Sequence, residues 1–282
     1  MSEVLTVIGQ ISILTFIITS MLAMGLSLTI AQIAEPLKDV RRVLLALLAS
    51  FVLVPGLAFL ITKLIPLEEG LATGLIIVGA AAGAPFLPKL VQTAKGNIAF
   101  SVGLMTLLMV VTVIYLPVVL PILLPGAEVN PLDIARSLIV MMLIPLGIGL
   151  FIKARYESTA ESLQPLMSQI SSYAIVLALV AILVVQFSSI IGTIGTGGIL
   201  AVLIFLAGAL VIGLLLGGRD ASMRSVMGLG TAQRNLSAAL LVAAQNFSDD
   251  PNVLVMVMLV TIIGLTLLMV VGGEMGKRAG SS

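Results

Sequence analysis

Two basic side chains, Lys89 and Arg234, lie well inside long apolar stretches of this sequence, where no Asp or Glu is found. A charged Arg at the centre of a bilayer costs about 2.5–3.5 kcal/mol on insertion scales. Arg234 lies about 12 residues from either end of its stretch, or roughly 18 Å at helical rise, so it cannot reach an aqueous surface. Backbone carbonyls, water or an anionic ligand must compensate its charge. Lys89 has two open interpretations: it lines a site, or it extends toward the interface.

Missing residue types exclude most catalytic chemistry. The 282 residues contain no Cys and no His, which removes disulfides, thiol nucleophiles and the commonest general base and metal ligand. An intramembrane enzyme is therefore the least favoured function, and we predict no catalytic residue, no metal site and no cofactor. The formal net charge of +1 gives no indication of a nucleic-acid partner.

Composition identifies the elements that must position these two cations. The chain is 60% apolar and 10% charged, with a mean hydropathy of +1.25. A soluble domain is nearer 25% charged, so a chain embedded in a lipid bilayer is expected. A helix needs about 20 mainly apolar residues to cross the hydrocarbon core. Nine stretches qualify: 5–30, 42–63, 70–94, 97–124, 132–153, 165–188, 196–217, 222–246 and 251–273. Breakers at the junctions include Glu35-Pro36 and Pro125-Gly126.

The basic residues outside the spans alternate between loops. Ten of the fourteen Lys and Arg fall in alternate connections or in the C-terminal tail, and only Lys63 and Arg136 fall on the other side. Cytoplasmic loops are enriched in Lys and Arg. The sequence thus predicts a multi-pass protein of the cell (inner) membrane, with its N-terminus outside and its C-terminus cytoplasmic. Its oligomeric state is not predicted.

The span 70–94 contains Pro85 and Pro88, which cannot both sit within a straight helix. Proline is well tolerated in the first turn of a helix. We therefore expect a half-helix to about Ala82, an unwound stretch, and a second half-helix from about Pro88.

The span 222–246 should also be interrupted. Gly228 and Gly230 weaken its middle, and a polar run follows them at membrane depth. That run contains Thr231, Gln233, Arg234 and Asn235. Two interrupted spans at corresponding places of two halves, here 1–125 and 130–282, indicate the substrate site of an inverted-repeat transporter. We predict an all-α fold in which these broken helices cross, with the exposed N–H groups of each second half-helix favouring an anion.

The candidate binding residues follow from this crossing. Arg234 is the predicted anchor of a small organic anion, with further polar groups around it. The candidates are Arg234, Asn235, Gln233, Thr231, Lys89, Ser101 and Ser50. Ser and Thr also act as packing contacts between membrane helices, so the weaker candidates have that alternative.

The sequence resembles the bile acid:sodium symporter family nearly from end to end. Met24-Gly-Leu-Ser-Leu-Thr29 is similar to an early family motif, and Ala94-Lys-Gly-Asn-Ile-Ala-Phe-Ser-Val102 to the helix after the first crossover. Arg234-Asn235 with Asn246-Phe247 is similar to the second crossover. The resemblance implies core and panel domains in a nine-helix form, and transport of organic anions such as bile acids, sulfated steroids or carboxylates with two sodium ions.

The chain departs from that family at the positions of the sodium ligands. The family's Ser-Asn pair falls on Leu87 and Pro88, its bridging Glu on Gly230, and the Gln of its Gln-Asn pair on Arg234. The family's Gln falls on Ser50 and its Thr on Met105, whereas its Ser is kept as Ser101. We hypothesise that Arg234, with or without Lys89, supplies the positive charge that sodium supplies elsewhere, because a nearby cation opposes cation binding.

Three functions remain open. The first is transport of an organic anion by alternating access without classical two-sodium coupling: facilitated diffusion, exchange, or proton coupling, for which Lys89 is the candidate group. The second is a sodium-coupled symporter with relocated ion ligands. The third is a membrane binding or sensor protein of the same fold that does not transport.

Overall fold

The computed structural model describes residues 2–34, 38–124, 130–186, 191–193 and 195–279. The described residues are helical, with no strand among them. Two of the expected junctions, Glu35-Pro36 and Pro125-Gly126, lie outside these ranges.

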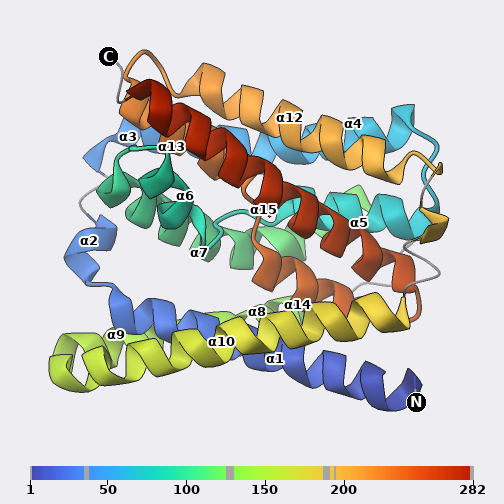
Figure 1. The fold of residues 1–282 in the computed structure, drawn as a ribbon, viewed down its shortest axis with the longest axis horizontal. Coiled ribbons are helices and arrows are strands. Elements are labelled where there is room, and N and C mark those ends of the chain that lie inside the picture. Colours follow the sequence, from blue (N-terminus) through green and yellow to red (C-terminus); the bar gives the residue numbers. More distant parts are fainter. Residues whose placement is uncertain (1, 35–37, 125–129, 187–190, 194, 280–282) are drawn as a thin grey trace.

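The helices form two layers (Figure 1). The layer drawn at the bottom, which we call the panel, contains α1 (Ser2–Ser27), α8 (Pro131–Leu138), the π-helix η3 (Ile139–Leu143), α9 (Ile144–Arg155) and α10 (Glu157–Val185). In the panel, α1 packs along both α9 and α10. Gly25 and Gly149 permit the α1–α9 crossing, since a Cβ on Gly25 would lie 2.9 Å from the Cα of Gly149.

The other layer, which we call the core, contains the remaining long helices and both broken spans. These are α3 (Val40–Leu48), the π-helix η2 (Ala49–Leu53), α4 (Val54–Leu64), α5 (Glu69–Ala80), α6 (Leu87–Thr93), α7 (Ile98–Leu123), α12 (Gly198–Leu216), α13 (Ala221–Ala232), α14 (Leu236–Asn246) and α15 (Pro251–Ala279). The short helix α2 (Ile30–Ala34) follows the panel helix α1 and packs on α7 of the core.

The same order of elements occurs twice. A long panel helix is followed by a core helix, a broken helix and a second long core helix: α1, α3–α4, α5/α6, α7, and then α10, α12, α13/α14, α15. The segment α8–α9 lies between the two units, and α1 and α10 run in opposite directions (Figure 1). This is the arrangement expected of an inverted repeat.

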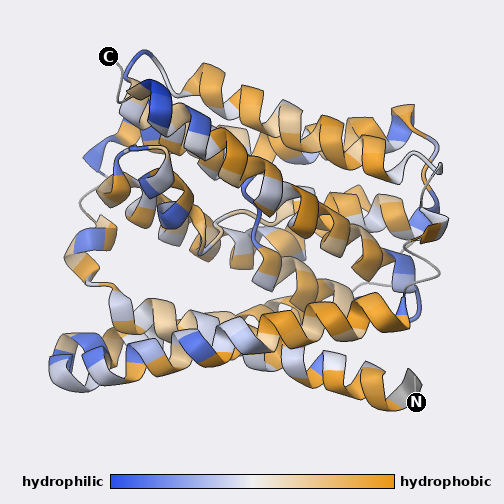
Figure 2. Cartoon of the chain, viewed as in Figure 1, coloured by the Kyte–Doolittle hydropathy of each residue, from blue (hydrophilic) through white to orange (hydrophobic). Residues whose placement is uncertain are grey.

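Seven helices of the described residues are long and apolar enough to cross a membrane. The two other expected spans, 70–94 and 222–246, are each divided into two shorter helices. Figure 2 shows apolar residues over most of the helical surface, with polar residues gathered toward the helix ends and along one half of α10. The chain is therefore an all-helical, polytopic membrane protein, while the count of nine crossings stays a prediction.

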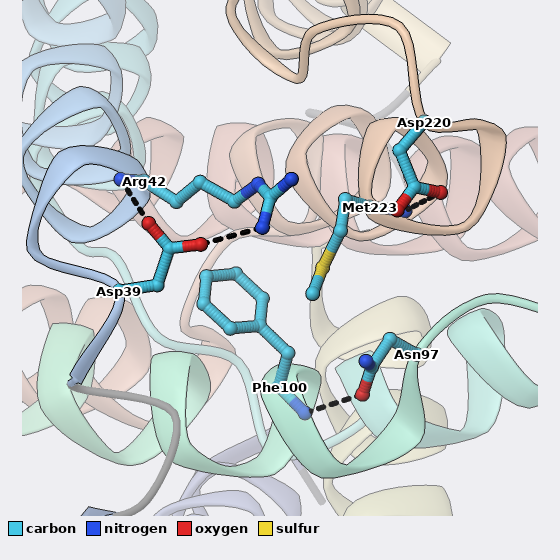
Figure 3. A network of polar contacts seen from close by, with 6 residues as sticks. All are labelled: Asp39, Arg42, Asn97, Phe100, Asp220 and Met223. Atoms are coloured by element: carbon cyan, nitrogen blue, oxygen red, sulfur yellow. Dashed lines mark hydrogen bonds and ion pairs between the residues drawn. The ribbon is translucent and has the colours of Figure 1, made fainter.

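Polar caps hold three helices of the core at the end that is rich in Lys and Arg. Asp39 accepts a hydrogen bond from the N–H of Arg42 and pairs with its guanidinium at the start of α3. Asn97 caps α7, and Asp220 caps α13 (Figure 3). Each cap satisfies N–H groups that the first turn of a helix leaves unpaired. The caps thereby fix where α3, α7 and the broken helix α13/α14 begin.

Candidate functional site

The first broken helix is interrupted close to the predicted position. Helix α5 ends at Ala80, residues 81–86 are not helical, and α6 begins at Leu87. Pro85 lies in the unwound segment and Pro88 in the first turn of α6, where its missing N–H costs nothing. Gly83 is required for a second reason, because its φ is +81° and a Cβ there would lie 2.2 Å from the backbone nitrogen of Met109.

The second broken helix is interrupted later in the sequence than expected. Helix α13 continues through Gly228 and Gly230 to Ala232, and residues 233–235 separate it from α14. The prediction that the two glycines break this helix was therefore wrong. They serve close packing instead: a Cβ on Gly228 would lie 2.6 Å from the Leu214 side chain, and one on Gly230 would lie 3.1 Å from that of Leu87.

Arg234 lies where the two breaks meet, and it is only 6% exposed. Its guanidinium donates four hydrogen bonds, all to backbone carbonyls. Nε donates to Val78 (3.2 Å), Nη1 to Thr231 (3.2 Å), and Nη2 to Gly79 (2.6 Å) and Ser50 (3.3 Å). A guanidinium carries five N–H groups, so one remains for a ligand. The carbonyls freed by the break in α5 thus provide much of the compensation that this buried charge needs.

Pro55 leaves free the carbonyl of Ser50, which is the acceptor of Arg234 most distant in the sequence. In η2 the N–H of Val54 donates five residues back to Ala49. Pro55, next in the chain, has no N–H, so the carbonyls of Ser50 and Phe51 lose a helical partner. Arg234 donates to the first and the Tyr115 hydroxyl donates to the second, at 2.6 Å.

Asn235 and Thr112 provide hydrogen-bond partners for Ala81 and Ala82 of the unwound backbone. The N–H of Asn235 donates to Ala81, its side-chain amide donates to the carbonyl of Ala82, and its side-chain oxygen caps Ala238 at the start of α14. The Thr112 hydroxyl of α7 accepts from the N–H of Ala82 and donates to its carbonyl. Non-helical backbone at membrane depth needs such partners, and the two breaks provide them for each other.

A cavity of about 540 Å³ lies between the panel and this crossing. Its panel wall is formed by α1 from Phe16 to Ser27 and by α10 from Gln164 to Val176. Its core wall is formed by both breaks, α14 and the middle of α15. The cavity therefore uses the halves of α1 and α10 that lead to the connections rich in Lys and Arg. A smaller cavity of about 100 Å³ lies at the opposite halves of the same two helices.

Three of the seven predicted binding residues line the larger cavity, namely Gln233, Arg234 and Asn235. The Gln233 side chain makes no hydrogen bond within the described part of the chain, whereas Asn235 is fully engaged in capping. The other four predicted residues do not line it: Thr231, Lys89, Ser101 and Ser50.

Local structure explains these four exceptions. Lys89 is exposed and bonded to Gln92 on the same helix, so of its two interpretations the outward one describes its position. The Ser101 hydroxyl donates to Ile98 within α7. Thr231 and Ser50 reach Arg234 only through their carbonyls.

Sequence reasoning missed most of the polar lining. The panel contributes side chains that were not predicted: Ser20, Ser27, Gln164, Ser168, Ser171 and Ser172. The available signal was the spacing in α10, where Ser168, Ser171 and Ser172 follow Gln164 by four, seven and eight residues. That spacing places these polar residues on one face of the helix. On the core side, Ser237 also lines the cavity, and its buried hydroxyl has no hydrogen-bond partner.

The first turn of α14 gathers unpaired polar groups of the core wall. Asn235 caps Ala238, but the N–H groups of Leu236 and Ser237 have no partner among the described residues. The N-terminus of a helix carries a partial positive charge and unpaired N–H donors, which favour an anion. With Arg234 two residues before Leu236, this turn is the most electropositive part of the cavity.

The described residues contain no group of three or more carboxylates that could hold a metal ion, and the sequence has no His or Cys.

Comparisons with known proteins found a matching family and several relatives. The model of the Sodium Bile acid symporter family matches residues 14–193. The chain is 28% identical over 153 residues to a protein of Arabidopsis thaliana named probable sodium/metabolite cotransporter BASS1, chloroplastic, covering 54% of this chain and 38% of that protein. The BASS1 protein of Oryza sativa is 26% identical over 235 residues, which cover 82% of this chain and 57% of that protein. The uncharacterized sodium-dependent transporter YocS of Bacillus subtilis is 28% identical over 169 residues, covering 57% of this chain and 51% of that protein. The matches thus span less than two thirds of the length of each of these relatives.

Proposed function

Because the chain belongs to the sodium bile acid symporter family, we propose that it is a secondary membrane transporter that moves an organic anion by alternating access. The substrate class is a carboxylate, a sulfonate or an anion of the steroid and bile-acid type. The observation that carries this proposal is the cavity between panel and core, which ends on the first turn of α14 beside Arg234.

The anionic group of the substrate binds at that first turn. The unpaired N–H groups of Leu236 and Ser237, the hydroxyl of Ser237 and the free amide of Gln233 are the donors nearest to the cavity. Arg234 adds a full positive charge behind them and offers its one remaining N–H. At about 5 Å and an effective dielectric constant near 20, a guanidinium attracts a carboxylate by about 3 kcal/mol. The same charge repels a sodium ion by a similar amount.

Coupling therefore does not use a sodium ion at this crossing. The guanidinium already occupies four carbonyl oxygens of the kind that bind hard cations. It holds the two breaks together without an ion, so facilitated diffusion and exchange are the modes that fit, whereas Lys89, the candidate group for proton coupling, lies outside the cavity.

A sodium-coupled symporter is the second candidate, and the names of the relatives favour it. Its ions would need ligands away from Arg234, and backbone carbonyls are the available type.

Alternating access requires the panel and core to separate on one side and then on the other. Beyond the cavity, Ser137 of α8 and Gln245 of α14 form a hydrogen bond between the panel and the core. With Lys and Arg marking the cytoplasmic side of a cell membrane, this contact closes the outer side and the cavity faces inward. That orientation has the N-terminus outside and the C-terminus in the cytoplasm.

The test is uptake of a set of labelled anions by proteoliposomes, with sodium or choline as the external cation. Ser237→Ala and Gln233→Ala should lower uptake severalfold, whereas Ser101→Ala, whose hydroxyl bonds within α7, should not. Ligand binding without any flux would support a sensor instead of a carrier. Uptake that requires sodium and ignores both cavity variants would favour the second candidate.

A further inference from the structure

The wall of the cavity opposite the crossing is polar but uncharged. Helix α10 contributes Gln164, Ser168, Ser171 and Ser172 to it, followed by the apolar Ile175 and Val176. This spacing places the polar side chains on one face of the helix. From position 162 to the end of α10 the sequence contains no charged residue.

Several of these groups have no partner of their own. Ser171 is only 7% exposed, and its hydroxyl makes no hydrogen bond to the described residues. The exposed Ser168 and the half-buried Gln164 also have free side chains within the described structure, whereas the Ser172 hydroxyl donates to the carbonyl of Ser168. A buried hydroxyl without a partner is unfavourable, so a hydroxyl aimed into a cavity indicates a ligand.

The two ends of the cavity differ in charge. Arg234 is the one charged residue among those that line it in the described part of the chain. The cavity is also lined by apolar side chains from α1 and α15, including Met24, Val260 and Leu268. A ligand with a second charge would bury that charge on α10 with no counter-ion, which is unfavourable. A neutral hydrogen-bonding group would be well accommodated there.

We propose that Ser168 and Ser171 are specificity-determining residues that bind a hydroxyl group at the far end of the transported monoanion. This inference rests on the proposed function, because it places the anionic group at the first turn of α14. The carrier then discriminates on two features: one negative charge at the crossing, and a neutral polar group on the panel side.

The test compares three anions of equal chain length as competitors and as labelled substrates in proteoliposomes: decanoate, ω-hydroxydecanoate and sebacate. A second set of hexanoate, ω-hydroxyhexanoate and adipate covers a shorter ligand. In at least one set, the hydroxylated monoanion should be preferred over the unsubstituted one by about fivefold, the scale of one or two ordinary hydrogen bonds. The dianion should be the poorest substrate.

Variants of Ser168 and Ser171 test whether these residues cause the preference for the hydroxylated anion. Ser171→Ala and Ser168→Ala should each reduce the ratio of hydroxylated to unsubstituted uptake toward one. Uptake of the unsubstituted anion above the level of empty liposomes shows that the variants fold. Ser162→Ala is the matched control, because Ser162 lies on the same helix outside the cavity and donates to Thr159.

The outcomes are distinguishable. Uptake of monoanions with no preference for the hydroxylated probes, or a preference for the dianions, overturns this inference and leaves the proposed function standing. A preference that survives both serine variants also overturns it. Uptake of no anion at all overturns both proposals.

Discussion

Removing the Arg234 guanidinium should destabilise the crossing of the two broken helices. In Arg234→Met, the carbonyls of Ser50, Val78, Gly79 and Thr231 lose a donor. An unsatisfied buried carbonyl costs about 1–3 kcal/mol, and the Val78 carbonyl keeps the N–H of Ala81, so the upper range is near 3–9 kcal/mol for the other three. Water from the adjoining cavity can replace some donors, and the cost of burying a charge disappears, so we expect a net loss of about 3 kcal/mol.

The assay is thermal unfolding of purified protein in detergent, followed by size exclusion. A loss of about 3 kcal/mol corresponds to a fall in Tm of roughly 5–10 °C in a chain of this size. Lys89→Met is the matched control: Lys89 is exposed and makes one hydrogen bond to Gln92, so its removal should change Tm by at most about 1 °C.

A second variant separates charge from geometry. Arg234→Lys keeps the positive charge but replaces a planar fork by a compact ammonium with three donors, so its stability should lie between those of wild type and Arg234→Met. If Arg234→Met unfolds at the wild-type temperature, the guanidinium does not hold the two breaks together, and the structural role assigned to it here is refuted.

Three further predictions concern the surrounding elements. Gly83→Ala should lower Tm strongly, because its φ of +81° and close approach to the α7 backbone exclude a Cβ; Gly56→Ala, which meets nothing within 4 Å, should leave thermal unfolding in detergent nearly unchanged. Tyr115→Phe leaves a freed carbonyl of η2 unpaired and should destabilise by about 1–2 kcal/mol in the same measurement. Oxidising the double variant Ser137→Cys/Gln245→Cys should stop uptake and reduction should restore it, since the chain has no other Cys; unchanged uptake after complete cross-linking would show that this panel–core contact need not open.

The sequence was sufficient for the broken helices because the causes are local. Pro85 and Pro88 cannot occupy a straight helix, and the structure unwinds residues 81–86 between α5 and α6. The second break was misplaced because a glycine weakens a helix only slightly. Tertiary packing kept Gly228 helical, since α12 approaches it too closely for a side chain.

The partners of Arg234 could not be predicted from its surroundings in the sequence. Its acceptors lie as far away as Ser50, which is available because Pro55 interrupts the hydrogen bonds of its own helix. A proline signal was present, but nothing local indicates which side chain will use the freed carbonyl. Likewise, the polar face of α10 was visible as a spacing, but only the packing of panel on core shows that it faces a cavity and not lipid.

Solute counterflow is the most direct test of the central claim that this protein is a carrier for an organic anion independent of sodium. Proteoliposomes are loaded with an unlabelled monoanion that was identified as a substrate in the uptake experiment. They are then diluted into sodium-free buffer with a trace of the labelled anion and sampled over time. We predict a transient accumulation of label in choline medium that is strongly reduced in Ser237→Ala. No accumulation, or accumulation only when sodium is present on both sides, would contradict the account.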